Sequence, residues 1–98
     1  MRNVMLILLA SSLFLASACS DPEIEIPKLI KQLKSSDSSA RNNAAMKLGS
    51  YGGDAQSAVR PLASLLNDEN GGVRSSAAFA LRKIGTPEAK RALDNYKK

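Results

Sequence analysis

Cys19 is the side chain best suited to covalent chemistry here, because it is the single cysteine among 98 residues. A catalytic thiol needs a neighbouring base, and the sequence contains no histidine. The same composition excludes the tetrahedral sets that bind structural zinc, and an internal disulfide. Lysines and carboxylates are present, but no pair is spaced as a recognisable acid–base site. The composition argues against an enzyme, and we predict no metal, no cofactor and no small-molecule substrate.

The residues around Cys19 favour its modification by lipid. It follows the small residues Ala16-Ser17-Ala18, and the stretch Leu15–Cys19 resembles the lipobox of bacterial lipoproteins. The resemblance implies that the sulfur of Cys19 receives a diacylglyceryl group and that Cys19 becomes the mature N-terminus. Each buried methylene of an acyl chain contributes about 0.8 kcal/mol, so several chains anchor a protein stably in the membrane. The alternative is an ordinary Ala-x-Ala cleavage site followed by a free thiol.

The residues before the cysteine are typical of an export signal. Arg2 is the only charged side chain before Asp21, and Val4–Leu9 is continuously apolar. A basic start, a short apolar segment and small residues at its end predict a secretory signal peptide, which we place at residues 1–18. The apolar run is at or below the ~20 residues that span a bilayer as a helix. An uncleaved membrane anchor is therefore the less favoured alternative.

An acidic segment separates the cysteine from the rest of the chain. We predict that residues 19–26 form a lipidated tether, because Pro22 and Pro27 oppose a long helix there. By analogy with enteric bacteria, Ser20 rather than aspartate after the cysteine favours the outer membrane over the inner one. The expected product is an exported protein, lipid-anchored at the cell envelope, with a folded domain over residues 27–98.

The folded domain contains an internal repeat. Aligning Ile26–Gly52 with Val59–Gly85, an offset of 33, gives seven identical pairs among 27, where average residue usage predicts about two. The identical pairs are Leu29/Leu62, Leu33/Leu66, Arg41/Arg74, Ala44/Ala77, Ala45/Ala78, Leu48/Leu81 and Gly52/Gly85. A period in this range indicates a solenoid, in which each unit buries its apolar face against the next.

The second half of each unit is predicted as a helix with clear ends. Asp37 and Asn70 precede these helices at equivalent positions and are good N-cap residues. Gly52 and Gly85 end them as C′ glycines do. Apolar residues recur at steps of 4, 4 and 3, as one helical face requires: Ala40, Ala44, Leu48 and Tyr51, then Val73, Ala77, Leu81 and Ile84.

The first half of each unit is predicted as a shorter helix, over residues 27–34 and 55–67. Pro61 lies inside the second of these and is expected to bend it or mark a weak turn. A fifth helix is expected from Pro87 to about Tyr96, as the first half of a third unit. The predicted fold is all-α, a short α–α solenoid (superhelix) of about two and a half units.

This pattern resembles the HEAT repeat, in the short variety first noted in phycobilin lyases. The resemblance covers residues 26–96 and is strongest in the second unit. Its hallmarks are Ala58-Val59-Arg60-Pro61-Leu62, Leu65-Leu66-Asn67-Asp68, Val73-Arg74, Ala77-Ala78-Phe79-Ala80-Leu81 and Ile84-Gly85. Armadillo repeats share the architecture but are longer, so they rank second.

The family resemblance also implies a ladder of charged residues between neighbouring units. In the family, an aspartate in the turn within a unit and an arginine opening the second helix form this ladder, and Asp68, Arg74 and Arg41 match those positions. We interpret the three as structural, because paired, half-buried charges in a repeat stack mostly fix its register. Ser35 stands where Asp68 stands in the second unit, which weakens one rung.

Met46 and Phe79 are the candidate partner-binding residues. They stand at equivalent positions of the two units, where the family usually has polar residues, on the ridge that faces the concave side of HEAT arrays. We predict an apolar patch anchored by these two side chains, with Lys47, Arg82 and Lys83 at its rim. The alternative is that they pack between units or are single exposed apolar side chains without a function.

Cationic side chains gather near the C-terminus. The expected last helix carries Lys90, Arg91, Lys97 and Lys98, and the whole chain has a formal net charge of +5. On a lipid-tethered domain these cations could contact anionic headgroups, but the favoured interpretation is a solvated helix end whose cations complement the helix dipole. Nucleic acid is not a predicted partner, because no aromatic stacking surface accompanies the charge.

Three functions remain in order of preference. The first is a non-enzymatic protein–protein interaction module at the cell envelope, with an unidentified protein partner. The second is an enzyme or enzyme subunit of the phycobilin lyase type, which the resemblance permits and the export signal opposes. The third is a self-associating structural solenoid piece, because five stacked helices risk exposing apolar surface at their ends, above all near Ile24, Ile26 and Ile30.

Overall fold

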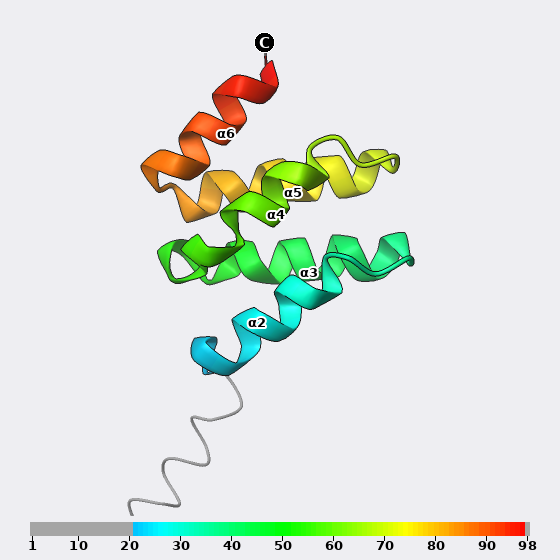
Figure 1. The fold of residues 1–98 in the computed structure, drawn as a ribbon, viewed down its shortest axis with the longest axis vertical. Helices are drawn as coiled ribbons and strands as arrows, with labels where there is room; N and C mark the ends of the chain where they lie inside the picture. Colours follow the sequence, from blue (N-terminus) through cyan, green and yellow to red (C-terminus); the bar gives the residue numbers. More distant parts are fainter. Residues whose placement is uncertain (1–20, 98) are drawn as a thin grey trace, which may run out of the picture.

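The computed structural model describes residues 21–97, and within that range the chain forms α-helices and one 3-10 segment but no β-strand (Figure 1). In chain order the elements are α2 (Pro22–Gln32), α3 (Ser38–Ser50), η1 (Gly52–Ala58), α4 (Val59–Leu65), α5 (Gly71–Ile84) and α6 (Pro87–Lys97). The predicted all-α fold is confirmed. The predicted signal peptide, residues 1–18, and the predicted lipidation site, Cys19, lie outside the described residues.

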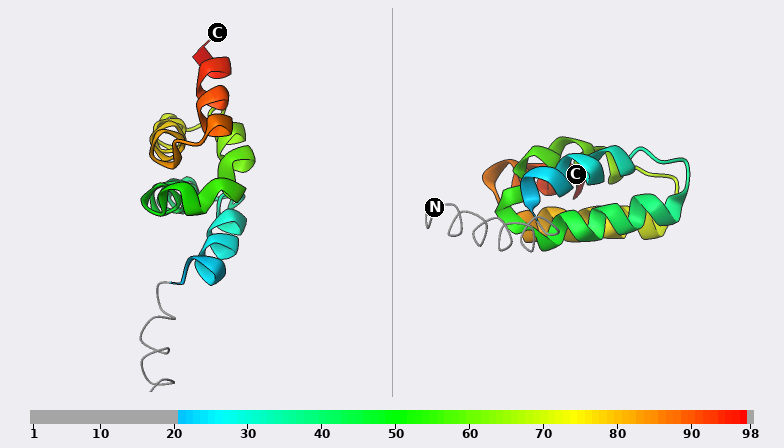
Figure 2. Two further views of the ribbon diagram at one scale, coloured as in Figure 1. Left: turned by 90° about the vertical axis from the view of Figure 1, so that its left-hand side faces the viewer. Right: turned by 90° about the horizontal axis from the view of Figure 1, so that it is seen from below.

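The helices stack in two layers, which both views of Figure 2 show. α2, α4 and α6 form the A layer, and α3 and α5 form the B layer. Each B helix packs against the A helix before it, and α3 and α5 share the most extensive contact of any two helices among the described residues. Two units, α2–α3 and α4–α5, are therefore complete, and α6 adds the A helix of a third. This is the predicted two-and-a-half-unit solenoid.

The residues repeated in the sequence form the core between the layers. Both members of four leucine or alanine pairs are buried: Leu29/Leu62, Leu33/Leu66, Ala44/Ala77 and Leu48/Leu81. The short side chains of the B layer let its two helices approach closely. A Cβ atom added to Gly49 of α3 would lie 3.0 Å from the Cα atom of Ala80 in α5. Any larger side chain at this position therefore has to push the two helices apart.

The ends of the B helices follow the predicted capping chemistry. The side chain of Asp37 accepts a hydrogen bond from the N–H of Ser39 at 3.1 Å, and Asn70 Oδ1 accepts one from the N–H of Val73 at 3.1 Å. Gly85 ends α5 with a φ of 65°, a left-handed conformation that glycine adopts without a steric penalty. These caps satisfy helix-end groups that would otherwise lack partners.

Helix α2 begins at Pro22, which differs from the tether predicted for residues 19–26 and the helix start predicted at residue 27. The side chain of Asp21 caps the helix by accepting a hydrogen bond from the N–H of Glu23 at 2.9 Å. Pro22 occupies the first helical position, where proline costs nothing. Pro27 does remove one intrahelical hydrogen bond, but the burial of Ile26 in the core supports the helix through it.

The predicted helix over residues 55–67 is two elements in the structure, and Pro61 does not divide them. Gly52–Ala58 is a 3-10 segment, within which Ala55 departs from helical geometry (φ −93°, ψ 23°). Pro61 is the third residue of α4. The first N–H groups of a helix have no acceptor inside it, so a proline there breaks no hydrogen bond. The expected bend at Pro61 is therefore absent, and the change of direction lies upstream at η1.

Candidate functional site

The structure brings the three predicted ladder residues together at one end of the B layer. Arg41 Nη2 lies 3.0 Å from Asp68 Oδ2, and each of these side chains is only 10% exposed. Arg41 Nη1 also donates to the carbonyl oxygen of Ser35 at 2.9 Å, within its own unit. Arg74 repeats that second bond one unit later, with Nη1 donating to the carbonyl oxygen of Asp68 at 2.7 Å. Arg41 therefore joins two units, whereas Arg74 braces only its own turn.

Asp68 is the centre of this arrangement. Its Oδ2 atom accepts hydrogen bonds from Arg41 and from the backbone N–H of Asn70, at 3.0 and 2.9 Å. The Arg41 hydrogen bond first, and then the Asn70 bond, lower the pKa of the Asp68 carboxyl below its ordinary value of 3.8. Ser35 reproduces only the local bond, because its hydroxyl accepts from the N–H of Asp37 at 3.1 Å. It has no carboxylate to offer an arginine.

Met46 and Phe79 both lie on the surface of the B layer. Met46 is 45% exposed and Phe79 is 37% exposed, so neither is buried between units. The Phe79 ring does lean over α3, because a Cβ atom at Gly49 would lie 3.6 Å from its Cε2 atom. Lys83 Nζ lies 6.0 Å from the centre of the ring, at the outer limit of a cation–π contact. The two apolar side chains thus lie on adjacent helices, and Phe79 has a cation beside its ring.

The B helices carry no carboxylate anywhere within 38–50 and 71–84. Their cations are Arg41, Lys47, Arg74, Arg82 and Lys83. Arg41 and Arg74 are occupied in the ladder, but Lys47, Arg82 and Lys83 are exposed, and none of these three pairs with a carboxylate of the described residues. We call Met46, Phe79 and these three exposed cations the B face. The B face thus combines two apolar side chains with charged side chains that are all cationic.

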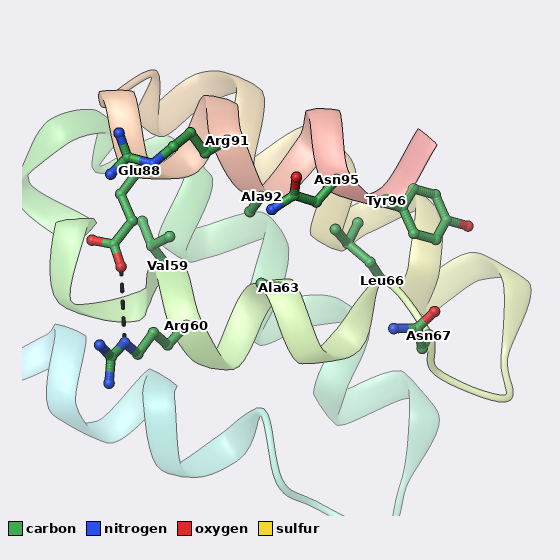
Figure 3. Close-up of a pocket in the computed structure, with 10 residues that line it drawn as sticks. All are labelled: Val59, Arg60, Ala63, Leu66, Asn67, Glu88, Arg91, Ala92, Asn95 and Tyr96. Carbon is green, nitrogen blue, oxygen red and sulfur yellow. Dashed lines mark ion pairs between the residues drawn. The ribbon is translucent and has the colours of Figure 1, made fainter. Parts of the chain in front are cut away.

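A groove of about 590 Å³ lies between α4 and α6 (Figure 3). Its lining residues are Val59, Arg60, Ala63, Leu66, Asn67, Glu88, Arg91, Ala92, Asn95 and Tyr96. Sequence reasoning missed this groove, because its walls come from helices of different units whose relative placement depends on how both pack against α5. No single stretch of sequence carries a signal for it.

The lining of the groove does not form an acid–base site. Its one carboxylate, Glu88, accepts a hydrogen bond from Gln56 and lies 3.9 Å from Arg60 Nε. Tyr96 lies at the opposite end of the groove from Glu88 (Figure 3). Eight residues of helix separate the two, about 12 Å at 1.5 Å per residue. At that separation the two side chains cannot exchange a proton directly.

Residues 21–97 contain neither a metal-binding cluster nor a helix that could span a membrane. No three histidine, cysteine, aspartate or glutamate side chains in this range lie close enough to hold a metal ion. No helix in the range combines the length and the apolar character needed to cross a membrane. Of the C-terminal cations, Lys90 and Arg91 are exposed on α6, while Lys98 and the side chain of Lys97 lie outside the described part of the chain.

Comparison with known proteins identifies the fold family. A family model of HEAT repeats matches residues 26–96, which is well over half of the chain. A comparison with curated proteins gives no match. HEAT repeats generally mediate protein–protein interaction, and the family is typically a non-catalytic scaffold. The matched range covers α3, α4 and α5, most of α2 and nearly all of α6, and it includes the Arg41–Asp68 contact described above. This chain therefore belongs to the HEAT-repeat family.

Proposed function

We propose that this protein is a non-enzymatic adaptor that binds a protein partner through its B face while lipid on Cys19 tethers it to the bacterial cell envelope. The observation that carries the proposal is the exposure of Met46 and Phe79 at equivalent positions of two adjacent helices. A few apolar anchors within a polar surround supply most of the binding energy of a protein interface. The two-layer stack holds both anchors on regular helices, so little order has to be gained on binding.

The partner-binding part is tested by capture from an envelope extract. The full chain and its Met46→Ser/Phe79→Ser variant are compared, and the variant is expected to lose the partners that the natural chain retains. Ile24→Ser is the matched control, because Ile24 is 48% exposed but lies on α2, in the A layer. Circular dichroism checks that all three chains are folded. An unchanged set of partners with a folded double variant would contradict the proposal.

The tether is tested separately, by intact-mass measurement of the protein made in its bacterial host. A chain that begins at Cys19 and carries the mass of a diacylglyceryl group and its fatty acyl chains, such as palmitate, is the expected result. The Cys19→Ser variant serves as the control and should show no lipid mass. An unmodified thiol at the N-terminus would instead indicate ordinary cleavage after Ala18, and the membrane tether would then be rejected.

A further inference from the structure

The carboxylates of the described residues all lie outside the two B helices. They are placed on the A layer or in connecting segments: Asp21, Glu23, Glu25, Asp37, Asp54, Asp68, Glu69, Glu88 and Asp94. The one exposed cation of α4, Arg60, has Glu88 3.9 Å away, whereas Lys47, Arg82 and Lys83 have no such neighbour among the described residues. The B helices thus carry cations and no carboxylate, whereas the A helices carry charges of both signs, so the positive charge of the B face is not balanced within its own layer.

The two anchors of the B face have a defined spacing. Met46 and Phe79 occupy equivalent positions of packed helices, and helices in contact lie 8–10 Å apart, axis to axis. The close approach at Gly49 places this pair toward the short end of that range. A polyproline-II segment advances about 9 Å in three residues and returns to the same side. Two apolar side chains at positions i and i+3 of such a segment can therefore reach both anchors.

The position of Lys83 indicates which residues should flank the apolar side chains of the bound segment. The ammonium group of Lys83 lies beside the Phe79 ring, 6.0 Å from the ring centre, so a segment that covers the ring passes next to a cation. A neutral or basic segment would leave this charge partly desolvated without a partner. A carboxylate next to the apolar residue would pair with Lys83 instead, and Lys47, the residue after Met46 on α3, offers a second exposed cation.

We propose that the B face binds an extended acidic segment of a partner protein, with apolar side chains at i and i+3 seated on Met46 and Phe79 and carboxylates facing Lys47, Arg82 and Lys83. The proposal rests on the proposed function and names the chemistry of the partner. An anionic lipid surface is less well matched, because such surfaces are recognised by clusters of about four to eight cations. The B face offers three exposed cations.

The test uses the full chain in neutral detergent and a fluorescent peptide that contains two leucines three residues apart, flanked by glutamates. The control peptide has glutamine in place of every glutamate and is neutral at these positions. Binding is measured by fluorescence anisotropy at low and at high salt. The acidic peptide is expected to bind about tenfold more tightly than the neutral one at low salt, with the advantage reduced at high salt. Equal affinity for the two peptides, or binding of neither, would overturn the proposal.

Charge reversal locates the contact on the protein. Lys47→Glu/Lys83→Glu is expected to weaken binding of the acidic peptide about tenfold. Lys28→Glu/Lys31→Glu is the matched control, because it makes the same change of net charge on exposed positions of α2, in the A layer. The affinity of this control variant for the acidic peptide should stay within about twofold of that of the natural chain. Equal weakening by both variants would show that only net charge matters and would also overturn the proposal.

The remaining outcomes separate this proposal from the broader one. If both peptides bind equally and both are lost in Met46→Ser/Phe79→Ser, the B face is a protein-binding surface without acidic preference, and only the present inference fails. Carbon-13 methionine methyl spectra test the lipid alternative, with Met46 assigned by Met46→Leu. A shift of the Met46 signal with phosphatidylglycerol in the micelles, but not with the acidic peptide, would replace the peptide by a lipid surface. If envelope capture is also insensitive to the double variant, the proposed function fails as well.

Discussion

Each B helix has an inner side, which faces the other B helix, and an outer side, which faces away from it. Equivalent positions carry different side chains on these two sides. Gly49 faces α5 from α3, and its equivalent one unit later is Arg82, which is exposed. Ala80 faces α3 from α5 and is fully buried, while its equivalent one unit earlier is the exposed Lys47. The same helical position is thus small where two B helices meet and long and charged where they do not.

This difference shows that the sides of α3 and α5 that face away from each other have the charged side chains of a solvent-exposed surface. Repeat stacks need polar outer faces at their ends to remain soluble, and here a single substitution per helix provides one. A further B helix could not approach α5 as closely as α3 does, because the side chain of Arg82 occupies the space that Gly49 leaves open. The arrangement opposes the close packing of another B helix against either outer side of the layer.

The largest expected effect comes from enlarging the inner position. Gly49→Leu should destabilise the protein by about 1–3 kcal/mol or more, because a Cβ atom alone already lies 3.0 Å from Ala80 Cα and 3.3 Å from its Cβ. Arg82→Leu, the same new side chain at the equivalent outer position, should change the free energy of unfolding by less than about 0.5 kcal/mol. Urea unfolding measures both. Equal losses would mean that the two sides do not differ in packing.

The next effect concerns the two arginines of the ladder. Arg41→Ala should cost about 2 kcal/mol, since it removes hydrogen bonds between charged groups and leaves the little-exposed carboxylate of Asp68 without its cation. Arg74→Ala removes bonds to carbonyl oxygens only and should cost less. Thermal unfolding of the two variants compares them directly. A larger loss for Arg74→Ala would show that bracing one turn matters more than joining two units.

A pH dependence should follow from the same ion pair. The folded-state pKa of Asp68 lies below its ordinary 3.8, so the stabilisation it gives is complete above that value and disappears as the pH falls through the lowered pKa. Asp68→Asn should therefore be less stable than the natural chain near neutral pH, and the gap should narrow in acid. Urea unfolding across this range measures the gap. A gap that stays constant with pH would exclude the ionised carboxylate as its source.

The smallest effect is expected at the B face itself. Met46→Ser/Phe79→Ser should lower the free energy of unfolding by about 1 kcal/mol, less than Arg41→Ala does, because 45% of Met46 and 37% of Phe79 are exposed. A small change would indicate that Met46 and Phe79 do not hold the two units together and are available for binding. A loss comparable to that of Gly49→Leu would show that the Phe79 ring contributes mainly by covering α3.

The periodic parts of this fold were predictable from the sequence, and the parts that depend on packing between units were not. Asp37, Asn70 and Gly85 define the ends of the B helices through local hydrogen bonds and local backbone geometry, so their effects can be read in sequence. The start of α2 has a local signal of the same kind, Asp21 followed by Pro22, but the continuation of the helix through Pro27 could not be read in sequence, because it depends on the burial of Ile26 in a core built by later residues. The prediction of a bend at Pro61 was wrong, because the effect of a proline depends on how close it lies to the start of the helix.

The candidate site divides in the same way. Met46 and Phe79 stand at equivalent positions in the sequence, but their exposure could be established only from the packed structure. The pairing of Arg41 with Asp68 was expected from the family resemblance, and the structure shows which oxygen it uses. The groove beside α6 had no local signature, because residues of two units form it together.

One oxygen atom, Asp68 Oδ2, is shared between a side chain of the first unit and the backbone at the start of α5. The loop before α5 cannot open without also releasing Arg41, and Arg41 cannot leave without loosening that loop. The two units should therefore melt together in a single concerted step, and amide protons on either side of the joint should become exchangeable at the same denaturant concentration.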